Sequence, residues 1–403
     1  MARILFVNIA AEGHVNPTLG LVKELVEHGE EVVYVCTEEF RNKITSTGAQ
    51  FRPYTLNEQV LAELGFSLTD VKHPLQFIEY LLRGLIEHQV PEILKLTKDD
   101  SFDFIVFDSM FGWGGYLLSE KLGIPSICSI THLVVPKVPN QEMPPIDTGD
   151  FDVAALIERI MTAAHQIAAE HNVDVPTIED IAGKIGEHKL VFTSRYFQPY
   201  ADLIDDSYVF TGPSIASRED APDFPLERLH SKYEQVVYIS MGTVLNKDVQ
   251  FYKLCFEAFT DIPAQFVLSC GKDTDLSELT NSIPPHFIIE PYVPQLEILQ
   301  RADAFITHAG MNSTSEGLYY NVPLVMIPLS TDQPYVAARV QELGAGIMLD
   351  KNSLTPEVLK SSLLQILTDA SYKTNAAKIG DSFREAGGHK AAAKHVMTLF
   401  SKV

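Results

Sequence analysis

The chain has 403 residues, of which 46% are hydrophobic and 21% charged, a composition typical of a globular protein with two or more domains. It carries 31 Lys and Arg against 53 Asp and Glu, a formal net charge of −22. This charge excludes nucleic acid or an anionic membrane surface as the main partner, because the protein would repel their phosphates. A local pocket for one anionic small molecule remains compatible with it.

No apolar run reaches the ~18 residues that a membrane span needs. The N-terminal apolar segment is short and ends in Glu12 and His14, without the small-residue pattern of a cleavage site. We therefore expect a cytoplasmic protein with no membrane insertion, and a monomer as the default, although the sequence does not fix the oligomeric state. The cysteines form no CxxC pair and lie in apolar stretches, so buried free thiols are expected at Cys36, Cys128, Cys255 and Cys270.

Short apolar runs alternate with helical patterns through the first half of the chain. Asn16 predicts a helix N-cap, Pro17 the first helical residue and Gly29 the helix end. Continuous apolar strands separated by helices predict a parallel sheet covered on both faces. The predicted strands are residues 3–10, 31–37, 103–108, 126–130 and 189–194.

The pattern breaks at residues 213–230, which hold three prolines and mixed charges and predict a linker. The alternation then restarts, with strands predicted at 235–243, 265–271, 287–292, 303–310 and 322–328. We therefore predict two α/β domains, residues 1–212 and 231–385. The last segment, 386–403, is predicted to be a helix that follows a hinge at Gly387-Gly388 and packs back on the first domain.

Two segments of the first half are less regular. Residues 55–100 predict apolar helices with a break at Pro91, and residues 133–150 are rich in proline. In a doubly wound domain such insertions lie at the carboxyl ends of strands, where ligands bind. We expect them to line an apolar binding site.

Several common motifs are absent from the sequence, namely GxGxxG after the first strand, a Walker A loop, HExxH and GxSxG. Two DxD strings occur, at residues 150–152 and 273–275. DxD can hold a divalent cation in sugar-nucleotide chemistry, but acidic residues at helix starts also act as caps. We expect these to be caps, and no metal site.

The most informative stretch is residues 292–333. Its strand ends in His308, small residues Ala309 and Gly310 follow, and a helix is predicted to open at about Asn312-Ser313. Small residues before a helix N-terminus let an anion reach backbone N–H groups, and the helix dipole favours negative charge there. The sequence therefore predicts a phosphate site to which His308 and the hydroxyls of Ser313 and Thr314 contribute.

Glu316 lies one turn beyond Asn312, on the same face of that helix. Residues 313–316 also match a capping box, S-x-x-E, in which Glu316 would only stabilise the helix start. Asp332 has a comparable alternative, as a plain N-cap before Pro334. The local pattern alone does not separate the structural from the functional interpretation.

In the first half, His14 follows the first predicted strand, in a loop, and Asp108 ends another strand. The carboxyl ends of parallel strands meet at one edge of a sheet, so both side chains can meet there. An Asp beside a His fixes the imidazole tautomer and stabilises the imidazolium formed on proton uptake. The alternative is a solvated loop histidine and a strand-end cap.

These motifs together resemble family 1 glycosyltransferases, the nucleotide-sugar enzymes of the GT-B fold, and in particular the bacterial macrolide and flavonoid type. The resemblance spans nearly the whole chain. It rests on residues 13–17 (GHVNP), 239–243 (ISMGT), Pro294-Gln295, His308, Gly310, Asn312-Ser313, Glu316, Val322-Pro323, Pro328 and Asp332-Gln333. Tyr292 stands where plant members usually carry Trp, and Ala309 and Met311 where they carry Cys and Trp.

The resemblance implies two Rossmann-like doubly wound domains facing across a cleft, and a role for each matching residue. Tyr292 would stack on uracil and Val293 would bond the edge of the base through its backbone. Gln295 and Glu316 would contact the ribose. His308, Gly310, Asn312, Ser313 and Thr243 would form the diphosphate site, and Asp332 and Gln333 would hold the sugar hydroxyls. His14 would be the catalytic base, supported by Asp108, with no metal required.

The function so implied is inverting transfer of a hexose, glucose from UDP-glucose, onto a hydroxyl of a small hydrophobic acceptor such as a flavonoid, macrolide or other phenolic. A nucleotide-sugar epimerase of the same architecture is one alternative, disfavoured by the apolar insertions and by His14. A non-catalytic nucleotide-sugar-binding protein is another. The sequence leaves open the acceptor and the choice between UDP and TDP.

Overall fold

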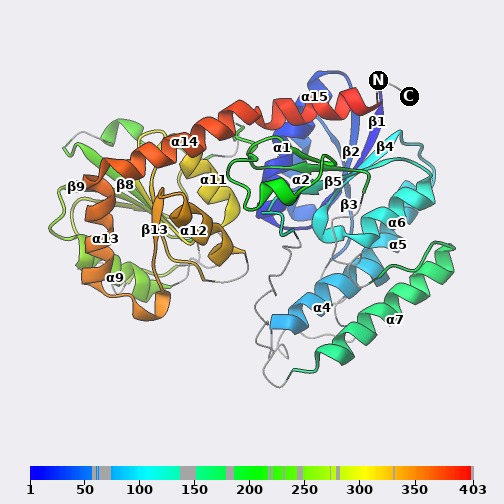
Figure 1. Cartoon of the computed structure of the whole chain (residues 1–403), viewed down its shortest axis with the longest axis horizontal. Coiled ribbons are helices and arrows are strands. Elements are labelled where there is room, and N and C mark those ends of the chain that lie inside the picture. The colour runs from blue at the N-terminus through cyan, green and yellow to red at the C-terminus, as the bar shows by residue number, and fades with distance from the viewer. Residues whose placement is uncertain are drawn as a thin grey trace. The chain divides into compact units, whose positions relative to one another are not determined.

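The protein is described here from a computed structural model (Figure 1). It describes residues 1–56, 60, 62, 74–136, 151–177, 186–216, 218, 221–229, 232–242, 248–272, 274–277, 282–329 and 332–400. The chain divides into two compact units. Unit 1 comprises Met1–Phe192, Tyr200–Ser214 and His389–Val403, and unit 2 comprises Thr193–Pro199 and Ile215–Gly388.

Unit 1 is built on a parallel sheet whose strands follow the order β3-β2-β1-β4-β5-β6-β7 within the described residues. The strands are β1 (Arg3–Val7), β2 (Glu31–Cys36), β3 (Gln50–Pro53), β4 (Phe104–Asp108), β5 (Ser126–Ile130), β6 (His188–Val191) and β7 (Tyr208–Phe210). Successive side chains of a strand point to opposite faces of a sheet. Both faces of the unit 1 sheet are apolar, so other elements of the fold have to cover both faces.

Helices cover both faces of the unit 1 sheet. Leu5, Val7 and Phe107 pack against one set of helices, whereas Ile4 and Phe6 pack against the other. The first set is α4 (Pro74–Gly84), η3 (Leu85–Gln89), α5 (Val90–Thr97), α6 (Trp113–Leu122) and α7 (Val153–His171). The second is α1 (Glu12–Glu27), α2 (Arg41–Thr45) and α15 (Gly388–Phe400). Short 3₁₀ turns η1 (Glu38–Phe40), η4 (Ser109–Phe111) and η5 (Ala201–Leu203) join the elements.

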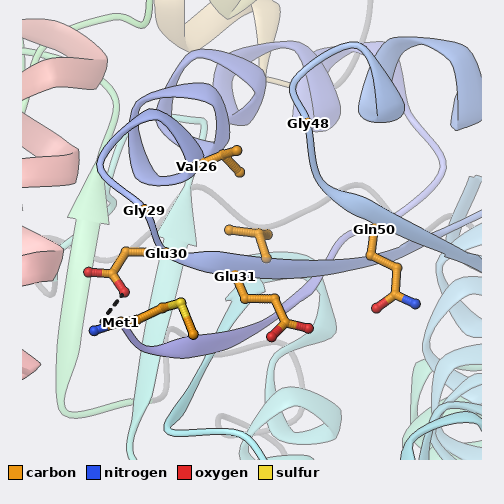
Figure 2. A pocket seen from close by; sticks show the side chains of 8 residues that line it. Met1, Val26, Gly29, Glu30, Glu31, Gly48 and Gln50 are labelled. Atoms are coloured by element: carbon orange, nitrogen blue, oxygen red, sulfur yellow. Dashed lines mark ion pairs between the residues drawn. The ribbon is translucent and has the colours of Figure 1, made fainter.

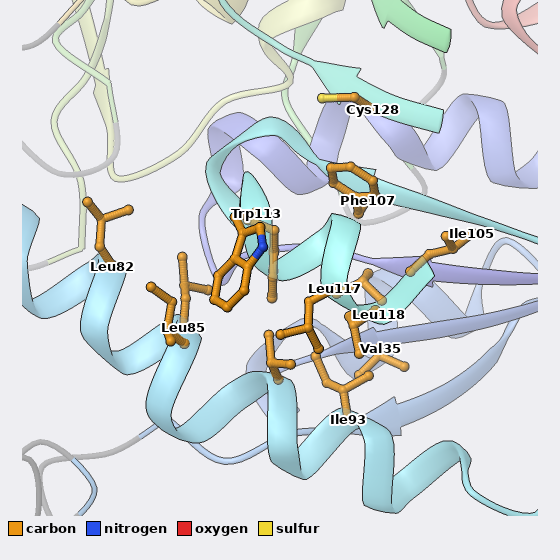
Figure 3. Close-up of a cluster of buried hydrophobic side chains, with 14 of the residues drawn as sticks. Val35, Leu82, Leu85, Ile93, Ile105, Phe107, Trp113, Leu117, Leu118 and Cys128 are labelled. Atoms are coloured by element: carbon orange, nitrogen blue, oxygen red, sulfur yellow. The ribbon is translucent and has the colours of Figure 1, made fainter. Parts of the chain in front are cut away.

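The core under α6 is centred on Trp113, whose side chain is 2% exposed. Figure 3 shows Trp113 pointing toward Leu85 of the neighbouring helical segment, with Leu117 beside it. The break predicted at Pro91 is a π-helical turn, η3, placed directly before α5. Pro91 occupies the first turn of α5, where its missing N–H is tolerated.

The prediction that α1 starts at Pro17 is wrong. The helix begins at Glu12, since the N–H groups of His14 and Val15 both donate to the Ala11 carbonyl, and Pro17 lies inside it. Proline is tolerated in early helical turns, so its presence marked the wrong residue as the start. His14 therefore belongs to the first turn of a helix and not to a loop. The predicted end is confirmed, with Gly29 at φ 88° just beyond the helix.

Unit 2 contains a second parallel sheet, in the order β10-β9-β8-β11-β12-β13 for the residues that are described. Its strands are β8 (Gln235–Ser240), β9 (Ala264–Ser269), β10 (Phe287–Glu290), β11 (Ala304–Thr307), β12 (Leu324–Met326) and β13 (Gly346–Met348). Its helices are α9 (Val249–Phe259), α10 (Gln295–Leu299), α11 (Met311–Tyr319), α12 (Gln333–Glu342), α13 (Pro356–Thr368) and α14 (Ala370–Ala386), with turns η6 (Leu226–Arg228) and η8 (Lys351–Ser353). Side chains of α9 and α13 form one continuous core with β8, β9 and β11.

Residues Thr193–Pro199 group with unit 2 although they follow β6 in the chain. Arg339 of α12 donates to the backbone carbonyls of Tyr196 and Phe197, at 2.8 and 2.9 Å. The Phe197 ring packs edge-on against Phe383 of α14. At the other end of the chain, Gly387 and Gly388 adopt positive φ angles between α14 and α15. Ala392, Ala393 and Val396 of α15 lie in the unit 1 core.

Each sheet reverses its strand order at one point. In unit 1 the chain adds β2 and β3 on one side of β1 and then continues with β4 on the other side. In unit 2 it adds β9 and β10 on one side of β8 and then β11 on the other. These are the predicted Rossmann-like doubly wound sheets. In such sheets ligands bind outside the carboxyl ends of the strands at the reversal point.

Candidate functional site

The reversal point of unit 1 holds His14, in the first turn of α1, and Asp108, the last residue of β4. His14 Nδ1 lies 2.8 Å from Asp108 Oδ2. The Asp108 side chain is fully buried, whereas that of His14 is 21% exposed. The second oxygen of the carboxylate, Oδ1, accepts from the backbone N–H of Met110 at 2.8 Å. Both carboxylate oxygens are thus engaged, which fixes the orientation of Asp108 toward the imidazole.

Thr131 completes this group, and the sequence analysis missed it. Its Oγ1 lies 3.1 Å from His14 Nδ1. Thr131 directly follows β5, which pairs with β4, so its position after a strand is the signal that could have found it. With Nδ1 facing both Asp108 and Thr131, Nε2 is the ring nitrogen through which His14 would exchange a proton.

A buried polar chain holds the backbone of the His14 turn. Asn8 Nδ2 donates to the His14 carbonyl at 3.0 Å and lies 2.9 Å from the Tyr34 hydroxyl. The Tyr34 hydroxyl is 2.8 Å from Thr18 Oγ1, and burial raises the pKa of Tyr34, which keeps it protonated. Through Asn8, which directly follows β1, this chain ties α1 to Tyr34 of β2. The position of His14 is therefore set by backbone contacts as well as by Asp108.

The reversal point of unit 2 holds His308, which directly follows β11. Gly242, after β8, and Gly310 make room for its ring. A Cβ atom at Gly242 would lie 2.7 Å from His308 Cε1, and one at Gly310 would lie 2.5 Å from Nε2. Burial lowers the pKa of His308 to about 4, against a smaller opposing effect of Asp332. The ring is therefore neutral at pH 7.

Helix α11 opens immediately after this histidine. Ala309 takes a left-handed conformation, φ 65°, which turns the chain sharply from β11 into the helix. Gly310 is the N-cap residue, so Met311, Asn312 and Ser313 form the first turn, one residue earlier than predicted. The backbone N–H groups of a first turn have no partner inside the helix and favour an anion. Thr243, the remaining residue predicted here, lies outside the described residues.

The capping-box interpretation of Glu316 is wrong. Ser313 is the third helical residue and not the N-cap, so the spacing that defines a capping box is out of register. The Glu316 carboxylate instead forms an ion pair with Arg218 through Oε1 and accepts from Gln295 Nε2 at 2.6 Å through Oε2. Gln295 and Glu316, both predicted ribose ligands, thus lie side by side.

The other predicted donor residues lie on nearby segments of unit 2. Tyr292 is 43% exposed, and Lys272 Nζ lies 5.3 Å from the centroid of its ring. Val293 is buried. Asp332 occupies the N-cap position of α12, although none of the cap hydrogen bonds described there involves its side chain. Gln333 is buried, and its Oε1 accepts from the backbone N–H of Leu329 at 2.7 Å.

The described residues of the DxD strings serve local structure. Asp152 caps α7 by accepting from Ala155 N at 3.0 Å, and Asp275 accepts from Ser277 N at 2.9 Å. Asp150 and Asp273 lie outside the described residues. Within the described ranges, no group of three or more His, Cys, Asp or Glu side chains is arranged to hold a metal ion.

Unit 1 also carries a pocket at the opposite edge of its sheet (Figure 2). It is lined by residues that precede or begin β1, β2 and β3, among them Met1, Val26, Glu30 and Gln50. These residues lie at the amino ends of the strands, away from His14 and Asp108. The four cysteines are buried thiols that form no disulfide, as predicted. None of the helices in the described ranges has the length and apolar character to cross a membrane.

Comparison with known proteins identifies the family. A family model described as UDP-glucoronosyl and UDP-glucosyl transferase matches residues 208–385. An uncharacterized UDP-glucosyltransferase, YojK of Bacillus subtilis, is 36% identical over 401 residues, which cover 98% of this chain and 97% of that protein. The chain belongs to this family. A further relative of this chain is the NDP-glycosyltransferase YjiC of Bacillus licheniformis. It is 35% identical, and the match covers 98% of this chain and 96% of YjiC.

Solved structures agree with this assignment. The glycotransferase of kitacinnamycin superposes on the chain with a TM-score of 0.83 and 26% sequence identity, covering 98% of both chains. The protein is thus a family 1 glycosyltransferase with the GT-B fold, as its sequence motifs imply. Nothing in these similarities supports an epimerase.

Proposed function

We propose that this glycosyltransferase moves glucose from UDP-glucose onto a hydroxyl of a small hydrophobic acceptor, such as a flavonoid, a macrolide or another phenolic. The observation that carries the proposal is the 2.8 Å contact between His14 Nδ1 and the fully buried Asp108. A binding protein has no use for such a pair at the ligand edge of a sheet. The relative YojK is named a UDP-glucosyltransferase, which supports UDP-glucose as the donor.

In the proposed mechanism, unit 1 binds the acceptor and His14 is the general base. Asp108 holds Nδ1–H, so neutral Nε2 takes the proton of the acceptor hydroxyl as its oxygen attacks the anomeric carbon. The Asp108 carboxylate then stabilises the imidazolium. General-base catalysis of this kind contributes roughly 10²–10⁴ in rate. Attack from the face opposite the nucleotide converts an α-linked donor into a β-glycoside.

Unit 2 binds the donor in this proposal. The N–H groups at the start of α11 stabilise the leaving diphosphate, together with the Asn312 and Ser313 side chains and with His308 beside them. Tyr292, with its exposed face, stacks on the uracil, and the Val293 backbone bonds the edge of the base. Asp332 and Gln333 hold the sugar hydroxyls. Gln295 and Glu316 bind the ribose.

The proposal includes no metal requirement, because helix N–H groups can stabilise the diphosphate charge directly. EDTA should therefore leave transfer within about twofold of the untreated rate, on the basis that no charge-stabilising group is removed. Initial rates with and without added Mg²⁺ measure this. Loss of activity in EDTA that Mg²⁺ restores would contradict the absence of a metal requirement. Asp150 and Asp273 of the DxD strings would then be candidate metal ligands.

The test of the function is incubation with UDP-glucose and a panel of flavonoids and macrolides, followed by mass spectrometry. We expect the acceptor mass to increase by one hexose and UDP to be released. A modified sugar nucleotide with unchanged acceptors would show an isomerase instead. If donor and acceptors both remain unchanged while UDP-glucose binds, the protein is a binding protein.

A further inference from the structure

The carboxylate of Glu316 is almost completely withdrawn from solvent, with a side chain that is 6% exposed. A buried charge is costly unless it is paired and hydrogen-bonded. The residue that pairs with it, Arg218, does not belong to the stretch 292–333. It lies in the segment 213–230 that the sequence predicts as a linker, and its side chain is 33% exposed.

Gln295 holds the carboxylate from the other side, and its own orientation is fixed from the core. The Tyr238 hydroxyl donates to Gln295 Oε1 at 3.0 Å, so the amide turns its Nε2 toward Glu316. Tyr238 is 1% exposed and stacks on Phe305, with 4.8 Å between ring centroids. Burial also raises the pKa of Tyr238, so the hydroxyl stays protonated. A rigid chain therefore runs from the unit 2 core to Glu316.

Each of the two contacts engages a different oxygen of the Glu316 carboxylate. Arg218 bonds Oε1 and Gln295 bonds Oε2. A carboxylate oxygen can accept about two hydrogen bonds, so each oxygen keeps capacity for one more. Two vicinal hydroxyls of a ribose require one acceptor each. Among the described residues each oxygen has one such partner, so Arg218 and Gln295 hold Glu316 with room for one further hydrogen bond per oxygen.

We infer that Arg218 is a positioning residue for donor recognition: it holds the Glu316 carboxylate in the orientation in which the carboxylate binds the ribose hydroxyls of the nucleotide. This inference rests on the proposed donor. Arg218 acts through Glu316 and not on the phosphates. Guanidinium is suited to the task because it remains charged and its N–H donors are held rigidly in one plane.

The experiment measures dissociation constants of UDP and 2′-deoxy-UDP by calorimetry, using the full chain. The variants are Arg218→Gln, Arg218→Lys, Glu316→Gln and the double variant Arg218→Gln/Glu316→Gln. Arg301→Gln is the matched control, since Arg301 is an exposed arginine of the same unit that contacts the Glu297 carbonyl. Melting temperatures without ligand report on folding.

We expect the wild type and the control to prefer UDP over 2′-deoxy-UDP by about tenfold or more, the value of one charged hydrogen bond. Glu316→Gln and Arg218→Gln should both reduce this preference to less than about threefold, and the double variant should match Glu316→Gln, because residues of one network are not additive. Arg218→Lys should keep an intermediate preference, since lysine restores the charge but lacks the rigid planar donors of guanidinium.

Equal weakening of both nucleotides by Arg218→Gln, or additivity in the double variant, would overturn the inference and place Arg218 on the phosphates. An unchanged preference in Arg218→Gln would also overturn it. If that variant does not fold, Arg218→Lys decides, and a full wild-type preference in it counts against the inference. A wild type that binds no UDP would overturn the proposed donor, and the inference with it.

Discussion

Each unit places a histidine where its sheet reverses strand order, and the two histidines have opposite surroundings. His14 follows β1 and His308 follows β11, and each lies where its sheet reverses strand order. His14 faces a buried carboxylate at 2.8 Å, whereas His308 is enclosed beside Gly242 and Gly310 and has its pKa lowered to about 4 by burial. The first arrangement can stabilise the imidazolium that forms when His14 takes up a proton, whereas the second keeps the His308 ring neutral. In the proposed function, unit 1 therefore supplies the proton acceptor and unit 2 the site for the diphosphate.

The largest effect that we expect comes from removing the His14 imidazole. His14→Ala should lower turnover by about 10²–10⁴, because the acceptor hydroxyl loses its general base. Steady-state kinetics with UDP-glucose and an accepted phenolic measure this. His165→Ala, an exposed histidine of α7, is the control and should keep wild-type turnover. Retention of more than about a tenth of turnover in His14→Ala would contradict the assignment of the base.

Asp108→Asn should lower turnover by no more than His14→Ala does. Asparagine can still accept from the Met110 N–H, so the fold should be kept, while the charge that stabilises the imidazolium is lost. We expect turnover to fall by roughly 10- to 10³-fold across the pH range. A pH–rate profile at unchanged melting temperature is the measurement. Full activity at every pH would make Asp108 a strand-end cap only.

A smaller effect is expected at the neutral histidine. In Gly310→Ala the added methyl group would lie 2.5 Å from His308 Nε2, so the ring must move. The backbone at Gly310 has φ −62°, which alanine adopts without strain. Any effect of the substitution is therefore due to displacement of the His308 ring and not to backbone strain. We expect about tenfold weaker UDP binding, or ~1.4 kcal/mol, with uridine binding unchanged because uridine lacks the phosphates. Equal weakening of both ligands would argue against a diphosphate beside His308.

The last effect concerns the stability of the fold against pH and involves neither turnover nor binding. The pKa of His308 is about 4 in the folded chain and 6.5 in the reference state, so the unfolded chain binds the proton first as pH falls from 6.5 to 4. Protonation therefore favours unfolding in that window, by up to about 3 kcal/mol. His308→Gln should lose less stability than wild type between pH 7 and pH 4.5, as thermal melts at both pH values would show. Parallel losses in both proteins would contradict a buried neutral ring.

Sequence patterns predict the interior of this fold better than its edges. The central strands are continuous apolar runs, and each was found within a few residues. Strands β3, β7 and β13 were not predicted, because they are short outer strands with polar or partly exposed residues such as Gln50 and Tyr208. The starts of α1 and α11 were also misplaced. Pro17 and Ser313 are common at helix starts, but here both lie inside a helix.

The residues of the two candidate sites were found to different degrees. His14, Asp108, His308 and Glu316 follow strands or lie on a helix face, positions that sequence periodicity can place. Thr131 was missed although it directly follows β5, a position of the same kind as that of His308 after β11. Arg218 was missed because its contact with Glu316 joins two segments that are 98 residues apart and share no sequence pattern. Arg218 lies in a proline-rich segment with no periodicity, so the sequence gives no direction for its side chain. Such contacts follow only from the packed structure.

The central claim is that proton transfer belongs to unit 1 and donor binding to unit 2. Calorimetric titration of UDP into His14→Ala, beside a turnover assay on the same preparation, tests it most directly. The account predicts a dissociation constant within about twofold of the wild-type value while turnover is lost, since His14 makes no contribution to ground-state donor binding. A loss of UDP affinity that matches the loss of turnover would contradict the separation of the two roles.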